Sequence, residues 1–306
     1  MRLANKKINI FDNLDFFAKQ QVEGFLVGLH KSPYHGFSVE FNEHRVYNPG
    51  DSIKNIDWKL FARSGKLFTK KYEEETNLNC HLLIDISSSM LYPKVKPEEL
   101  SLNKLSFSIY SAACLMYLLH KQRDGYGLTF FSDKIESFIP SKLSKSHYNR
   151  ILTALHDKLK NAVNDYKGTN LSNVVTSLID QIKQRSLIVI FSDMIDSDDT
   201  DNLFEGLNHL MYKKNEVILF HIKEVLTEEL FSFSNHPHQF IDLETKMKIQ
   251  LNPQSYKETY LKYYSDFQDK LKLKCKQFNI DYVSCSINDG FSKVMTNYLQ
   301  KRKKLF

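Results

Sequence analysis

Glycine and proline are scarce in this chain, whose 306 residues include 10 of the first and 7 of the second. No stretch is rich in glycine, serine or proline, so the sequence predicts neither a flexible linker nor a low-complexity segment. Hydrophobic residues make up 42% of the chain, which is enough for a sizeable core. We expect an ordinary globular protein.

Long hydrophobic runs are also lacking. None approaches the roughly 18 apolar residues of a membrane span, and the start, MRLANKKINIFDNLDFF, has no apolar core of the signal-peptide type. The most apolar segment, KLSFSIYSAACLMYLLH, contains three serines and is bounded by Lys104 and His120, which is typical of a buried helix. We expect no membrane span and a cytoplasmic protein.

Cysteine and excess charge are both low. The net charge of +6 is diffuse, and its one dense basic run, the terminal KRKKLF, has no aromatic platform beside it, so we expect no nucleic-acid partner. The cysteines lack C-x-x-C spacing, which indicates buried, reduced thiols and not a zinc or redox site. They are Cys80, Cys114, Cys275 and Cys285.

From about residue 80 onward, short apolar runs alternate with longer amphipathic ones, as strands alternate with helices. Because the apolar runs are uniform, they predict strands covered on both faces: an α/β fold with a mostly parallel sheet between helices. The segments FFSDKIESFIP and HQFIDLETKMKIQLNP read as hairpins. The strand candidates are NCHLLIDIS, GYGLTFFSD, SLIVIFSDMI, NEVILFHIKEV and IDYVSCSI, and the helix candidates lie near 104–122, 146–160, 171–183, 200–213, 255–277 and 290–301.

The N-terminal quarter behaves differently. A helix-like stretch, NLDFFAKQQVEGFLVGLH, gives way to short β-like pieces, turns and dense charge. We predict a mixed helix and β-turn segment at 1–76, packed on a sheet domain at 77–306 that has a hairpin insertion near 228–252.

Two predicted strands end in acidic residues, Asp85 in LLIDISSS and Asp193 in IVIFSDMID. Ligands of open parallel sheets bind beyond the carboxyl ends of strands. The alternation of an extended segment puts Ser87 and Ser89 on the side of the Asp85 carboxylate, and Thr169 precedes a helix-like run in YKGTNLSN.

These five side chains all offer oxygen, which suits a hard divalent cation: Mg²⁺, or Mn²⁺ or Ca²⁺ in its place. Two carboxylates neutralise such an ion without filling its coordination sphere, so an acidic group from another molecule has room to bind. The competing interpretation is helix capping, which is common for Ser and Thr before helices. The coincidence of D-x-S-x-S, G-T and S-D, in that order, favours the metal.

The same order resembles the metal-ion-dependent adhesion site of von Willebrand factor A-like domains, with Asp85, Ser87, Ser89, Thr169 and Asp193 matching it. RVYNPGDSIKNIDWKLFARSGKLFTKKYEEE, residues 45–75, resembles the signature of the bacterial domain of unknown function 58 family, and FIDLETKM is similar to its late hairpin. The resemblance runs from about Val22 to the last helix. It implies a von Willebrand A-like, Rossmann-like fold and a MoxR-type AAA+ ATPase as partner, acting in the assembly or maturation of other proteins.

The residues of that upstream signature also have a physical interpretation. Asn48 to Asp51 form a tight turn in which Pro49 and Gly50 set the backbone. We expect Trp58, the only tryptophan, to anchor the segment on the core. We also expect acids and arginines to pair, although the two arginines are alternatively an anion or nucleotide contact. The signature set is Arg45, Tyr47, Gly50, Asp51, Asp57, Trp58 and Arg63.

Catalysis has weaker support. The sequence shows no G-x-S-x-G elbow with a placed histidine, no G-x-G-x-x-G and no phosphate-binding G-x-x-x-x-G-K loop. We therefore favour a non-enzymatic module that binds protein through the metal. The alternative is a metal-dependent hydrolase that uses the same oxygen cage, for which Asp196, Asp198 and Asp199 are the nearby acids.

Overall fold

The computed structural model describes residues 13–30, 44–46, 58–70, 78–94, 102–161, 168–194 and 200–305. The chain forms two compact units, residues 24–77 and residues 1–23 with 78–306. The larger unit takes in the start of α1 (Leu14–His30), where the Phe17 ring lies 4.7 Å from Tyr110 and 5.3 Å from Phe291. The two-domain division predicted from the sequence stays a prediction.

The larger unit is built on a six-stranded sheet with the order β10-β7-β6-β3-β4-β5. All neighbouring strands run parallel except β4 and β5, which are antiparallel. The strands are β3 (Asn79–Asp85), β4 (Gly125–Phe131), β5 (Ile135–Lys142), β6 (Ser186–Ser192), β7 (Glu216–Lys223) and β10 (Asp281–Ser286).

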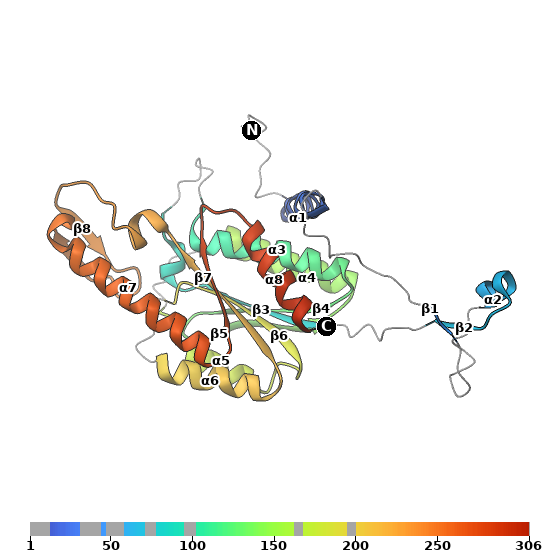
Figure 1. Cartoon of the computed structure of the whole chain (residues 1–306). Coiled ribbons are helices and arrows are strands. Elements are labelled where there is room, and N and C mark those ends of the chain that lie inside the picture. The colour runs from blue at the N-terminus through green and yellow to red at the C-terminus, as the bar shows by residue number, and fades with distance from the viewer. Residues whose placement is uncertain are drawn as a thin grey trace. The chain divides into compact units, whose positions relative to one another are not determined.

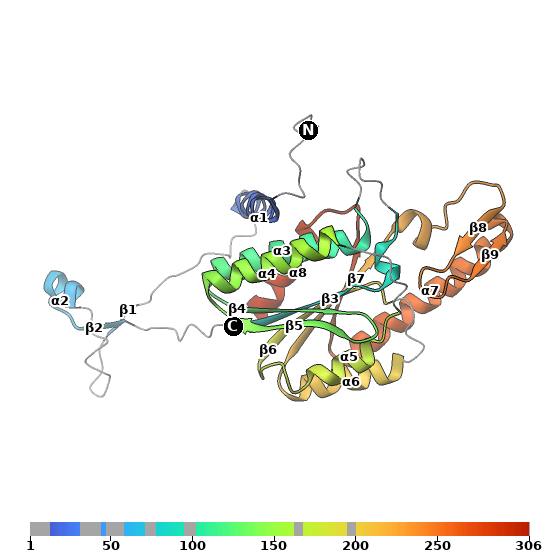
Figure 2. The same cartoon turned by 180° about the vertical axis from the view of Figure 1, so that it is seen from behind.

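Helices cover both faces of this sheet (Figures 1 and 2). One layer consists of α3 (Lys104–Lys121), α4 (Lys145–Lys160) and α8 (Ser292–Leu305), and the other of α5 (Leu171–Leu178), α6 (Thr200–Tyr212) and α7 (Pro253–Gln277). Every residue of β4 and β6 is buried, as expected for parallel strands between two helical layers. The predicted α/β fold class is confirmed.

The strand order changes direction between β3 and β6. From β3 the chain moves outward to β4 on one side, and later returns to place β6 on the other side of β3. Neighbouring loops therefore leave the β3 and β6 ends in opposite directions, which opens a crevice at the carboxyl ends of these two strands. The predicted site residues Asp85 and Asp193 lie at these ends.

Both segments predicted as hairpins pair antiparallel. β5 follows β4 and forms a partly exposed edge of the main sheet. The second hairpin, β8 (His238–Ile241) with β9 (Lys248–Leu251), lies between β7 and α7. It is preceded by a short π-helix, η4 (Val225–Glu229), that begins directly after β7.

The smaller unit contains β1 (His44–Val46), which pairs antiparallel with β2 (Phe68–Lys70), and α2 (Trp58–Ser64). Trp58 is 58% exposed, and its indole meets the Phe61 ring edge-on at 6.1 Å. Within this unit Trp58 is the first residue of a seven-residue helix, and the prediction that it anchors the segment on the core stays a prediction.

The rest of the upstream signature is only partly described. Arg45 lies in β1 opposite Thr69, and Arg63 is exposed in the last turn of α2. Tyr47, Gly50, Asp51 and Asp57 lie outside the described residues, so the predicted pairing of acids with arginines stays a prediction.

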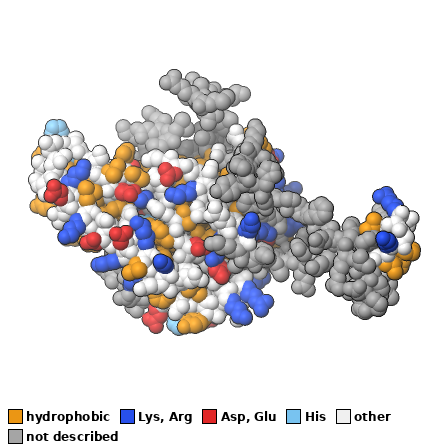
Figure 3. Space-filling model, in the orientation of Figure 1, with side chains coloured by type: hydrophobic (Ala, Val, Ile, Leu, Met, Phe, Trp, Pro, Cys, Tyr) orange, Lys and Arg blue, Asp and Glu red, His pale blue; other side chains and the backbone are white. Residues whose placement is uncertain are grey.

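The four cysteines are free and buried, as the sequence predicts. In the part of the chain that the structure describes, no helix combines the length and apolar character needed to cross a membrane. The face seen in Figure 3 mixes acidic, basic and apolar side chains.

A buried histidine gives the sheet a pH-sensitive element away from the strand ends. The Nε2 atom of His81, in β3, lies 2.8 Å from the Thr129 hydroxyl, and its ring stacks on Phe138 at 5.2 Å. Gly127 makes room for it, since a Cβ there would lie 2.5 Å from His81 Nδ1. Burial lowers the pKa of His81 to about 4.

We predict that His81→Asn flattens the pH dependence of stability. In the unfolded chain this histidine is protonated below about pH 6.5. In the folded protein, buried His81 is protonated only near pH 4. The free energy of unfolding therefore falls by up to about 1.4 kcal/mol per pH unit across this window because of this residue. Urea unfolding at several pH values should show a smaller slope in His81→Asn, whereas exposed His236→Asn keeps the wild-type slope. Equal slopes in all three proteins would contradict the assignment.

We predict that Trp58→Ala, which truncates a ring that is 58% exposed on α2, changes the free energy of unfolding by less than about 0.5 kcal/mol if the ring makes no contact beyond its own unit. Phe220→Ala is the contrasting variant. Phe220 is fully buried in β7 and stacks on Phe191 at 5.1 Å, so its loss should cost about 3 kcal/mol or more. Denaturant unfolding monitored by circular dichroism checks both values, and a loss of about 3 kcal/mol in Trp58→Ala would confirm the prediction that Trp58 anchors the segment on the core.

Candidate metal site

Two buried carboxylates meet at the crevice between β3 and β6. Asp85 is the last residue of β3, Asp193 follows directly after β6, and they are 0% and 1% exposed. Burial first, and the negative charge of Asp193 second, raise the pKa of Asp85 to about 7, although hydrogen bonds from Ser192 and Ser87 oppose the shift. The Ser192 hydroxyl donates to Asp85 Oδ2 over 2.7 Å. This corner of the sheet thus holds negative charge that only cations or protons can balance.

The serines after Asp85 turn back toward it. The Ser87 N–H donates to Asp85 Oδ1 over 2.9 Å, and the hydroxyls of Ser87 and Ser89 lie 3.0 Å apart. The sequence predicts these two hydroxyls on one side through the alternation of an extended strand. They come together for a different reason, because residues 88–91 form a 3₁₀ helix, η3 (Ser88–Leu91), that closes the turn.

Thr169 belongs to the loop that leads into α5. Asn170 N–H donates to the Ser132 carbonyl over 3.1 Å, which ties this loop to the residue that follows β4. The Thr169 hydroxyl oxygen is buried and makes no hydrogen bond to any residue that the structure describes. Buried hydroxyls rarely go without a partner, so this atom marks a place where a ligand fits.

The capping interpretation fails for both groups of hydroxyls. The helix that Thr169 precedes is capped by Asn170, whose side chain accepts the N–H of Asn173 over 3.0 Å. Ser87 stands at the start of η3 but makes no side-chain capping bond. Helix capping therefore does not account for Ser87 or Thr169.

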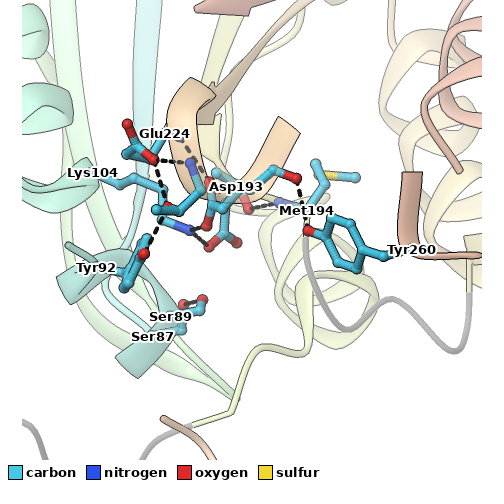
Figure 4. Close-up of polar contacts among 11 residues, drawn as sticks. Ser87, Ser89, Tyr92, Lys104, Asp193, Met194, Glu224 and Tyr260 are labelled. Atoms are coloured by element: carbon cyan, nitrogen blue, oxygen red, sulfur yellow. Dashed lines mark hydrogen bonds and ion pairs between the residues drawn. The ribbon is translucent and has the colours of Figure 1, made fainter. Parts of the chain in front are cut away.

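Lys104 provides the positive charge beside Asp193, a role that the sequence analysis did not predict. Its ammonium lies 2.6 Å from Asp193 Oδ2 (Figure 4). It also lies 2.6 Å from Glu228 Oε1. Lys104 is the first residue of α3, where the helix dipole disfavours positive charge, and it is 0% exposed. Burial alone would lower the pKa of this ammonium, but the carboxylates of Asp193 and Glu228 raise it above its ordinary value. Two carboxylates therefore hold Lys104 as a charged ion.

Glu228 connects this ion pair to the segment before the hairpin. It belongs to the π-helix η4, and its second carboxylate oxygen accepts the Glu224 N–H over 2.8 Å. Two tyrosines hold the same helix from outside: Tyr92 bonds the Thr227 hydroxyl at 2.6 Å, and Tyr260 bonds the Glu228 carbonyl at 2.7 Å. η4 is thereby linked to η3 on one side and to α7 on the other.

A pocket of about 440 Å³ opens beside the site. Ser89 and Lys104 form part of its polar wall. Aromatic side chains form the apolar wall, where Phe231 lies 4.4 Å from Tyr260 and stacks on Phe240 at 6.0 Å. The pocket thus reaches the site at Ser89 and Lys104, and its volume would hold a side chain of another molecule.

The donor set fits a hard cation. Among the residues that the structure describes, no three His, Cys, Asp or Glu side chains are grouped so as to hold a metal ion. Any ion here would therefore rely on two carboxylates, Asp85 and Asp193, with hydroxyls and waters for the rest. Mg²⁺ binds in this way, usually keeping several waters. Two observations agree with such an ion. The Thr169 hydroxyl makes no hydrogen bond to a described residue, and burial disfavours the ionised form of Asp85, which a cation would stabilise.

Two residues of the site were not predicted, Ser192 and Lys104, although the sequence contains a partial indication of each. Ser192 stands next to Asp193 in FSDM, which could have marked it as a partner of an acid at the strand end. Lys104 is the first residue of an otherwise apolar helix, a position that indicates only a polar helix boundary. Nothing in the sequence links Lys104 to Glu228, which lies 124 residues away.

Residues 43–268 match the family described as "Protein of unknown function DUF58". The chain belongs to this family. It is 23% identical over 182 residues to a protein of Mycobacterium tuberculosis described as "Uncharacterized protein Rv1480", a match that covers 60% of this chain and 55% of that one. It is 26% identical over 141 residues to "Uncharacterized protein YeaD" of Bacillus subtilis, covering 45% and 32%. The chain thus spans about half the length, or less, of these relatives.

Solved structures show a distant similarity. The crystal structure of a conserved hypothetical protein, BatB, from Bacteroides thetaiotaomicron matches with a TM-score of 0.47 and 13% identity, over 74% of this chain and 99% of that one. A minor pilin, PilB, from Streptococcus sanguinis matches with a TM-score of 0.42 and 11% identity, over 78% and 64%.

We predict that Lys104→Met destabilises the fold by about 3–5 kcal/mol, because it leaves Asp193 and Glu228 buried without their cation. Adding Glu228→Gln should recover part of the loss, with a coupling energy of about 1 kcal/mol or more. Lys213→Met is the matched control: Lys213 pairs with Asp180 at 2.9 Å near the surface, so its loss should cost less than about 1 kcal/mol. Equal effects of the two lysine variants in urea unfolding would contradict this account.

Proposed function

We propose that this chain is a non-enzymatic protein-binding module that captures an acidic group of its partner through a Mg²⁺-type site. The observation that carries the proposal is the buried Thr169 hydroxyl without a hydrogen bond, on the loop tied to the rim where Asp85, Ser87, Ser89 and Asp193 meet. The resemblance to the metal-ion-dependent adhesion site of von Willebrand A-like domains supports the same five residues.

Each residue has a distinct role in this proposal. Asp85 and Asp193 supply the negative charge, and Ser87, Ser89 and Thr169 supply neutral oxygens. When bound, the metal supplies positive charge with a coordination position that a carboxylate of another molecule can take. Mn²⁺ and Ca²⁺ accept similar oxygen ligands and are the substitutes to test.

The hydrogen bonds that Asp85 already accepts leave capacity for a cation. Each Asp85 oxygen accepts one described hydrogen bond, one from Ser87 and one from Ser192, and a carboxylate oxygen has a second lone pair. The Asp193 Oδ2 atom accepts from the Lys104 ammonium over 2.6 Å. A metal would share Asp193 with Lys104, so we expect a modest affinity.

The partner that we propose is a MoxR-type AAA+ ATPase, acting with this chain in the cytoplasm on the assembly or maturation of other proteins. This part of the proposal rests on the family resemblance. The pocket beside Ser89, with its aromatic wall, supports it by offering apolar contacts next to the metal.

A metal-dependent hydrolase is the alternative use of the same oxygen set. It needs a general acid or base near the metal. The sequence candidates Asp196, Asp198 and Asp199 lie outside the described residues, and no described contact favours this alternative.

We predict that the wild-type chain binds Mg²⁺ and Mn²⁺, that Asp193→Asn abolishes binding, and that Thr169→Val weakens it about tenfold or more. Thr169→Val should leave the metal-free fold as stable as wild type, because it removes a hydroxyl that bonds nothing. Thr176→Val, on the exposed side of α5, is the control. Calorimetric titration decides: unchanged metal affinity in both site variants would refute the proposed site.

The partner is tested with a purified MoxR-type AAA+ ATPase from the same organism. We expect the immobilised chain to retain the ATPase with Mg²⁺ and to release it with EDTA, and Asp193→Asn to retain none. Retention that ignores both EDTA and the substitution would place the contact elsewhere on the chain.

A further inference from the structure

The buried ammonium of Lys104 has two acidic partners from different parts of the chain. Its Nζ atom lies 2.6 Å from Asp193 Oδ2, directly after β6, and 2.6 Å from Glu228 Oε1, in η4. The side chains of Lys104 and Asp193 are each 1% exposed, and that of Glu228 is 14% exposed. Charges interact strongly where water is excluded, so a change at one carboxylate affects the other through the ammonium that they share.

A divalent ion at the strand ends would meet this ammonium. If the two cations share Asp193 Oδ2, a metal–oxygen bond of about 2.1 Å puts the ion within roughly 5 Å of Lys104 Nζ. Two positive charges repel each other at this distance. Asp193 therefore binds each cation more weakly in the presence of the other.

Glu228 is held in position by contacts other than the one to Lys104. Its Oε2 atom accepts the Glu224 N–H over 2.8 Å, and its carbonyl accepts the Tyr260 hydroxyl over 2.7 Å. Lys104 can therefore stay paired with Glu228 when its bond to Asp193 weakens. A buried ammonium that keeps one carboxylate avoids the large cost of an unpaired charge.

A second ion pair of η4 provides an internal comparison. Lys223, the last residue of β7, lies 2.5 Å from Glu229 Oε2, and the two side chains are 10% and 34% exposed. Two lysine–glutamate pairs thus connect η4 to the rest of the fold. Among the ion pairs that the structure describes, the Lys104 pair is the one that also includes a proposed metal ligand.

We propose that Lys104 competes with the metal for Asp193 and that metal binding leaves its ammonium to Glu228 alone. This inference rests on the proposed metal site and deepens it by naming what regulates the site. Once the ion neutralises Asp193, the undivided pair of Lys104 with Glu228 holds η4 more firmly. Glu228 lines the pocket of about 440 Å³, so metal binding fixes one wall of the pocket beside the site. By linkage, a partner that holds η4 in place raises the metal affinity by the same factor.

Two charge-neutral double variants test the competition. Lys104→Gln with Glu228→Gln removes the competing ammonium and its second acid, and the new amide still offers Asp193 a hydrogen-bond donor. Lys223→Gln with Glu229→Gln removes the other ion pair of η4. In calorimetric titration with Mg²⁺, we expect the first double variant to bind about tenfold more tightly than wild type, and the second to bind like wild type. Equal affinities in all three proteins would overturn the competition.

Two single variants decide the same question if circular dichroism shows that the first double variant folds poorly. Glu228→Gln leaves Lys104 paired with Asp193 alone, so we expect Mg²⁺ to bind about threefold more weakly or worse. Glu229→Gln removes the same charge one residue further along η4 and should stay within about twofold of wild type. Equal affinities in these two variants contradict the role of Lys104.

Hydrogen exchange tests the connection to η4. We expect Mg²⁺ to slow the amide exchange of residues 225–230 in wild type and in Lys223→Gln with Glu229→Gln, because Lys104 then holds Glu228 more firmly. The same amides should not respond to Mg²⁺ in Lys104→Gln with Glu228→Gln. Exchange that stays unchanged in wild type at saturating Mg²⁺ would overturn the connection.

The outcomes separate this inference from the proposal beneath it. If wild type and Lys104→Gln with Glu228→Gln bind Mg²⁺ equally and Asp193→Asn binds none, the role of Lys104 is refuted and the metal site stands. If that double variant binds Mg²⁺ and wild type does not, the competition is confirmed and the proposed metal-dependent function is refuted. If neither binds Mg²⁺, both are refuted.

Discussion

The burial of negative charge at the β3 and β6 ends is the constraint on which the rest of this structure depends. Asp85 and Asp193 are both shielded from solvent at the point where the sheet changes winding direction. An isolated buried carboxylate is too costly to persist, so each must be supplied with donors or cations. Ser192 and Ser87 serve Asp85, and Lys104 serves Asp193. This requirement explains the positions of three segments: the start of α3, which holds Lys104, the turn after β3, which holds Ser87, and the segment after β7, which holds Glu228.

The compensation also connects parts of the chain that are far apart in sequence. Lys104 joins α3 to β6 and, through Glu228, to η4. Tyr92 and Tyr260 then join η4 to η3 and α7. If Asp193 bound another cation, its ion pair with Lys104 would weaken. The ion pair between Lys104 and Glu228 would then change, and with it the position of η4. Two ion pairs, Asp193 with Lys104 and Lys104 with Glu228, thus couple the strand ends to the segment that precedes the β8–β9 hairpin.

The sequence predicted the parts that depend on local pattern and failed where distant residues decide. Uniformly apolar runs indicated the buried parallel strands, and their acidic ends located Asp85 and Asp193, because alternation and strand polarity are readable from short segments. The Lys104 to Glu228 pair depends on the path of the whole chain, so no window contains it. Thr169 was found by pattern, but its unbonded hydroxyl could be seen only in three dimensions.

The hairpin interrupts the crossover between two parallel neighbours, β7 and β10. The segment from η4 to β9 therefore begins and ends outside the sheet, and none of its residues takes part in the register of the main strands. Changes of length or sequence in it leave the sheet's hydrogen bonding intact, as is usual for loops carried on a rigid scaffold. The chain can in this way vary what surrounds the strand ends while the ends themselves stay fixed. Among proteins of this fold, we expect differences in binding partner to result mainly from sequence changes in the segment from η4 to β9.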